Sequence, residues 1–61
     1  MGKEATFKDY IEAIITLLCD SYDYTVAKAR EEVEDFSEFL SICFSDGWSV
    51  LSCVEMIAAE A

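Results

Sequence analysis

Apolar side chains recur at helical spacing along most of this chain. Over residues 6–21 they fall three or four positions apart, as on one face of an α-helix. The members of this first set are Phe7, Tyr10, Ile11, Ile14, Leu17 and Leu18. Thr6 can cap the helix, because Asp9 stands three residues later and can return a hydrogen bond to the cap. The pattern therefore predicts a helix over residues 6–21.

A second apolar set continues from residue 25 to residue 44. Its members, here called the apolar seam, are Val26, Ala29, Val33, Phe36, Leu40 and Cys43. They alternate three and four positions apart, which predicts one central helix of about 30 Å over residues 25–44. Gly47 can adopt a positive φ and so end this helix.

The pattern of apolar residues in the last part of the chain predicts a third helix over residues 48–60. Its apolar residues are Trp48, Val50, Leu51, Val54, Ile57 and Ala58. They cover more than half of the helix circumference, so this helix should be buried on more than one side. The fold class expected is all-α: a compact three-helix bundle (6–21, 25–44, 48–60) that forms a single small domain over residues 1–61.

The composition indicates that part of the surface of this domain binds a partner or a second copy of the chain. The chain has 61 residues, of which 54% are hydrophobic, and a net charge of −9. A domain of this size buries only about 60% of its unfolded surface, so some large apolar side chains should remain for a partner or a second copy. A homodimer is therefore expected.

The charge balance narrows the kind of partner. Thirteen acidic residues against four cations disfavour direct contact with nucleic-acid phosphates or with an anionic membrane. No apolar run is long enough to span a bilayer. The expected partner is the basic surface of another protein.

Cysteine usage indicates a reducing compartment. Cys19, Cys43 and Cys53 are far apart in sequence, and the chain has no histidine. This spacing disfavours a disulfide framework, a metal site or any other cofactor site, so we expect free, mostly buried thiols in a cytoplasmic protein.

Four carboxylates fall on one stripe of the predicted central helix, opposite the apolar seam. They are Glu31, Glu34, Asp35 and Glu38, here called the acidic face. Each pair of like charges at this spacing destabilises a helix by a few tenths of a kcal/mol. The face is either a solvated side of the helix or a docking strip for arginine and lysine side chains.

Two apolar residues border the acidic face. Ile42 has nearly the same helical bearing and should be exposed, while Phe39 lies on the flank, where another helix can cover it or leave it free. An apolar anchor inside a charged rim is typical of a protein interface. On the third helix, Trp48, Cys53 and Met56 either complete the core or form a homodimer seam.

Enzymatic chemistry has little support, because no histidine is present to activate a serine or a cysteine. The function expected is non-catalytic protein binding. Its concrete form is a small acidic inhibitor or adaptor whose carboxylates imitate the phosphates of a nucleic acid on a basic, nucleic-acid-binding surface. The alternative is a structural homo-oligomeric assembly subunit that associates through its third helix.

Overall fold

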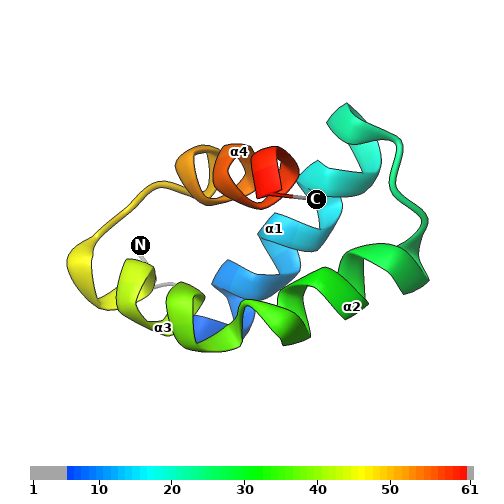
Figure 1. Ribbon diagram of the computed structural model, residues 1–61. Coiled ribbons are helices and arrows are strands. Elements are labelled where there is room, and N and C mark those ends of the chain that lie inside the picture. The colour runs from blue at the N-terminus through cyan, green and yellow to red at the C-terminus, as the bar shows by residue number, and fades with distance from the viewer. Residues whose placement is uncertain (1–5, 61) are drawn as a thin grey trace, which may run out of the picture.

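The computed structural model describes residues 6–60, which form four helices and contain no strand. Figure 1 shows their arrangement. The helices are α1 (Phe7–Tyr22), α2 (Val26–Asp35), α3 (Ser37–Asp46) and α4 (Val50–Glu60). Residues 1–5 and 61, which belong to the predicted domain, lie outside the described part. The all-α prediction is confirmed, but the predicted count of three helices is wrong.

The difference arises at Phe36, where the expected helix over residues 25–44 is divided into α2 and α3. Phe36 has φ −102° and ψ 19°, outside the helical range. The two helices follow each other end to end along one side of the molecule (Figure 1). Two effects favour the break. The last turn of a helix has partial negative charge, which disfavours Glu34 and Asp35 at the end of α2. The first turn of a helix has partial positive charge, which favours Glu38 at the start of α3.

Side-chain caps fix where the helices begin. Thr6 Oγ1 accepts from the backbone N–H of Asp9 at 3.2 Å, and the Asp9 carboxylate accepts from the Thr6 N–H at 3.4 Å, as the sequence predicted. Thr25 Oγ1 accepts from the N–H of Lys28 at 3.1 Å and begins α2. The predicted role of Gly47 is confirmed, since it ends α3 with φ 81°.

The last helix starts two residues later than the sequence predicted. Ser49 Oγ accepts from the N–H of Ser52 at 3.2 Å, so Ser49 acts as a cap and Trp48 belongs to the preceding turn. Leu51 then points outward with 54% exposure, although its position had suggested the core. The expectation that this helix is buried on several sides is therefore too strong.

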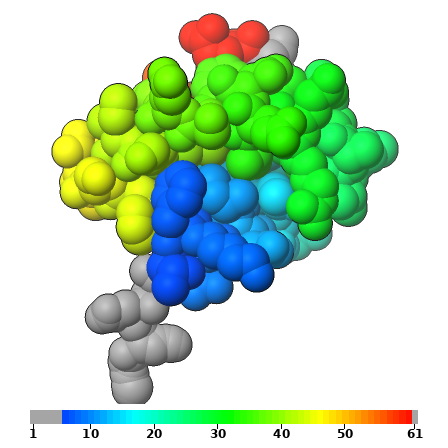
Figure 2. Space-filling model, turned by 90° about the horizontal axis from the view of Figure 1, so that it is seen from below, coloured from blue at the N-terminus to red at the C-terminus, as the bar shows by residue number. Residues whose placement is uncertain are grey.

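The core lies where α1 meets the other three helices. On the face turned away from α4, α1 lies alongside α2 and α3 (Figure 2). The apolar seam supplies Ala29, Val33, Leu40 and Cys43 to the core, but its first member, Val26, is exposed. The remaining buried residues come from α1 and α4: Tyr10, Ile14, Ile15, Leu18, Cys53, Val54 and Ile57.

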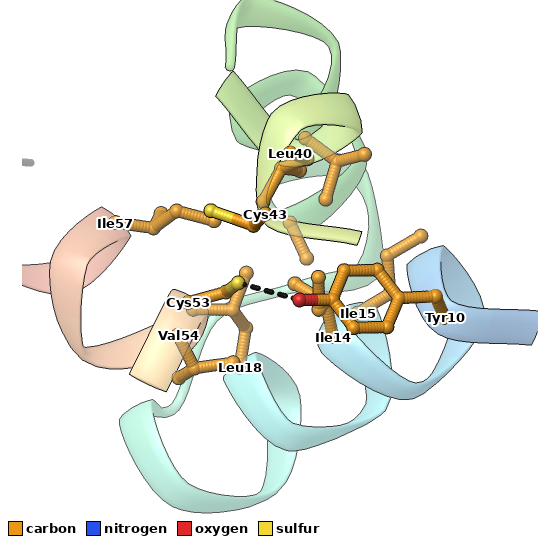
Figure 3. Packing of buried hydrophobic residues seen from close by; sticks show 11 residues of the cluster. Tyr10, Ile14, Ile15, Leu18, Leu40, Cys43, Cys53, Val54 and Ile57 are labelled. Atoms are coloured by element: carbon orange, nitrogen blue, oxygen red, sulfur yellow. Dashed lines mark hydrogen bonds between the residues drawn. The ribbon is translucent and has the colours of Figure 1, made fainter. Parts of the chain in front are cut away.

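Tyr10 connects α1 with the α3–α4 turn and with α4. Its hydroxyl donates to the carbonyl oxygen of Trp48 at 2.9 Å. The hydroxyl oxygen also lies 2.9 Å from Sγ of Cys53 (Figure 3). Because the only hydrogen of the hydroxyl is donated to Trp48, the Cys53 thiol is the donor in this second contact. The Tyr10 ring meets Phe44 of α3 at a centroid distance of 5.1 Å. These contacts fix the position of Trp48 on the surface.

Candidate protein-binding surface

The acidic face is exposed at each of its four positions. Glu31, Glu34 and Asp35 lie on α2, and Glu38 lies in the first turn of α3. The break at Phe36 means that the four carboxylates do not form the straight row along one helix that the sequence predicted. They are divided three and one between two consecutive helices.

A fifth carboxylate in the same run is turned inward. Glu32 is only 8% exposed, and its Oε2 lies 3.1 Å from Nζ of Lys28. The hydrogen bond and charge of Glu32 raise the pKa of Lys28. This is the only ion pair within residues 6–60, so no lysine or arginine of the described part forms an ion pair with the acidic face.

The two apolar neighbours of the acidic face differ in exposure. Ile42 is 61% exposed, as its helical bearing predicted. Phe39 is half-buried, because the ring of Trp48 stands edge-on to it at a centroid distance of 5.9 Å. The ring of Phe39 also meets the ring of Phe36, at a centroid distance of 6.4 Å. The turn before α4 therefore supplies part of the cover of Phe39, and the helical core supplies the rest.

The residues expected to form a self-association seam do not share one surface. Of the two alternatives for Cys53, its place is in the core, because its side chain has no exposed area and donates to Tyr10. Trp48 and Met56 are 40% and 41% exposed. Leu51, which the sequence had suggested for the core, joins them as an exposed apolar residue near the start of α4.

A hollow between α1 and α2 was not predicted from the sequence. Its volume is about 400 Å³, and it is open to solvent. The lining residues are Ile11, Ile15, Ala27, Arg30, Glu31, Val33 and Glu34. The small side chain of Ala27 is the one sequence signal for it, because an alanine leaves space beside larger neighbours. The hollow thus shares Glu31 and Glu34 with the acidic face.

The buried thiol of Cys43 and the hydroxyl of Tyr10 are poor candidates for nucleophilic chemistry. Burial, followed by the contact with Cys53, raises the pKa of the Cys43 thiol from 9.0 to about 11. Burial also raises the pKa of Tyr10. Both groups are therefore protonated near neutral pH, and a protonated thiol is a weak nucleophile.

Within residues 6–60, no group of three or more histidine, cysteine, aspartate or glutamate residues is arranged to hold a metal ion. None of the helices in this range has the length and apolar character needed to cross a bilayer. No protein-family model, curated protein or solved structure matches the chain. A proposal about function therefore rests on the surface itself.

Proposed function

We propose that this chain is a non-catalytic protein-binding module whose acidic face docks against a basic surface of a partner protein. The observation that carries this proposal is the exposure of all four carboxylates of the acidic face, the last of which, Glu38, lies one helical turn before Ile42, which is 61% exposed. Charged residues around an exposed apolar side chain have the arrangement of a protein interface, in which the apolar group is the anchor and the charges form the rim.

The negative charge of the chain indicates the kind of partner surface that it binds. A chain with a net charge of −9 is repelled by phosphates and attracted to lysine- and arginine-rich surfaces. Carboxylates three or four residues apart on a helix stand about 5–6 Å from one another. This spacing resembles that of phosphates along a nucleic-acid strand, so the basic groove of a nucleic-acid-binding protein is the surface proposed. By occupying this groove, the chain acts as an inhibitor of the partner or as an adaptor for it.

The proposed setting is the cytoplasm, without contact with a membrane. Cys19, Cys43 and Cys53 are all free thiols, and free thiols persist where the surroundings are reducing. The buried positions of Cys43 and Cys53 support a role in packing.

The test is capture of partners from a lysate of the host cells with three forms of the tagged chain. The first is the wild type. The second carries Glu34→Lys, Asp35→Lys and Glu38→Lys in the acidic face. The third, a matched control, carries three reversals at exposed carboxylates on α1 and α4: Glu12→Lys, Asp20→Lys and Glu55→Lys.

The two triple variants have the same net charge, so a difference between them reports position alone. The proposal predicts that wild type and control capture the same basic protein at low salt, that the face variant does not, and that salt weakens the capture steeply. Equal capture by both triple variants, or capture that is insensitive to salt, contradicts the proposal.

A second candidate function is self-assembly near the start of α4. The observation that favours it is the exposure of three large apolar residues, Trp48, Leu51 and Met56, in and beside this helix. Sedimentation equilibrium gives the mass directly, and the candidate requires at least twice the 6.9 kDa of one chain. The assembly should be lost in Trp48→Ala or Met56→Glu, whereas a monomer at high concentration excludes it.

A further inference from the structure

The hollow between α1 and α2 combines an apolar floor with a charged rim. Ile11 and Ile15 of α1 form the floor together with Val33 of α2, and Ala27, which is exposed, lies at the edge. A closed apolar cavity of about 150 Å³ already holds a benzene-sized group. At about 400 Å³, the open hollow has room for an aliphatic side chain from a partner and for part of the backbone that carries it.

The charge of the rim indicates which charge an occupant of the hollow should have. Glu31 and Glu34 stand on the rim against the single cation Arg30, so the rim is net negative, and Asp35 extends the negative charge along α2. A second copy of this chain would bring a net charge of −9 toward these carboxylates. Its approach is opposed by long-range repulsion. A basic segment is complementary to both the floor and the rim.

We propose that this hollow receives a leucine-like side chain of a basic amphipathic helix in the partner, while lysine or arginine residues of the same helix pair with Glu31 and Glu34. A helix fits a groove between two helices and presents anchors three or four residues apart. This inference rests on the proposed function, because it supplies the apolar contact for the same acidic face. The partner's leucine contributes affinity, and its cations select the orientation.

The test uses two fluorescein-labelled peptides of about 16 residues, long enough to form a helix. Both are rich in lysine and alanine and have equal charge. One carries two leucines four positions apart, and the other has alanine at those positions. Ala27→Leu fills the hollow from its edge, and Ala13→Leu makes the same change at an exposed alanine on α1 outside the hollow. Circular dichroism verifies that both variants keep their helices.

Fluorescence anisotropy at low salt separates the outcomes. The wild type and Ala13→Leu should bind the leucine peptide about tenfold or more tightly than the alanine peptide, which corresponds to burial of a leucine side chain. Ala27→Leu should remove this preference and keep the binding of the alanine peptide, because the carboxylates are unchanged.

Four results would overturn the inference. If the wild type binds both peptides equally, or if Ala27→Leu retains the preference, the hollow is not the leucine site, and the proposed function still stands on the charge-dependent binding. If neither peptide binds the wild type, the proposed function fails as well. If the chain alone dimerises in sedimentation and Ala27→Leu abolishes the dimer, the occupant is a second copy.

Discussion

Replacement of Tyr10 by phenylalanine tests how the core supports the surface near α4. The change removes one oxygen atom and leaves the ring in place against Phe44, 5.1 Å away. Two polar groups lose their partner: the carbonyl oxygen of Trp48 and the thiol of Cys53, each 2.9 Å from the hydroxyl oxygen. Tyr10→Phe thus isolates the hydrogen bonds that join α1 to the α3–α4 turn and to α4.

The magnitude follows from the burial of the groups left behind. A hydrogen bond contributes about 0.5–1.5 kcal/mol net, and a buried group without a partner costs about 1–3 kcal/mol. The bond to Trp48 is only partly buried, so water can replace part of it, whereas the contact with Cys53 is fully buried. We expect Tyr10→Phe to lower the free energy of unfolding by about 1.5 kcal/mol. For a domain of this size, that loss lowers the Tm by about 6–12 °C.

Urea and thermal unfolding followed by circular dichroism give both quantities. Tyr22→Phe is the matched control, because Tyr22 is exposed and should change the free energy of unfolding by less than about 0.5 kcal/mol. Trp48 is the only tryptophan of the chain, so its fluorescence should shift to the red when its carbonyl is released. If Tyr10→Phe is as stable as Tyr22→Phe and the emission is unchanged, the reasoning about this contact is refuted.

Three further predictions concern helix ends and pH. Gly47→Ala should lower the free energy of unfolding by about 1–2 kcal/mol, because alanine is strained at φ 81°, and Gly47→Asn should cost less; equal losses in urea unfolding would contradict this. Thr25→Ala should cost about 1 kcal/mol through loss of the cap on α2, and an unchanged urea midpoint would disprove it. Folding raises the pKa of the Cys43 thiol from 9.0 to about 11, so the unfolded chain releases this proton first as pH rises. The stability advantage of the wild type over Cys43→Ala should therefore shrink above pH 9.0, and a constant difference up to pH 11 would contradict it.

Periodicity predicted the helical regions and most of the core, although not the number of helices. The spacing of Ala29, Val33, Leu40 and Cys43 identified the buried side of the region that became α2 and α3, because that side faces the core in both helices. The break at Phe36 was not predictable from the same pattern. No proline or glycine marks it, and it is favoured by the carboxylates at the end of α2 and in the first turn of α3.

The candidate surface was predictable only in part. The exposure of Ile42 follows from its bearing on one helix, which the sequence determines. The burial of Cys53 depends on which flank of α4 receives Tyr10, and the cover of Phe39 depends on where the turn places Trp48. The hollow depends on the separation of α1 and α2. These three features arise from contacts between different elements of the fold, which no periodicity within one helix can show.

Zero-length cross-linking tests the central claim, the docking of the acidic face on a basic surface, most directly. A carbodiimide joins carboxylates to lysine amines that touch them, and mass spectrometry of the complex captured from host lysate identifies the carboxylates that reacted. The account predicts cross-links to the partner from the four carboxylates of the acidic face. Cross-links that come instead from Glu12 and Asp20 of α1 or from Glu55 of α4 would contradict it.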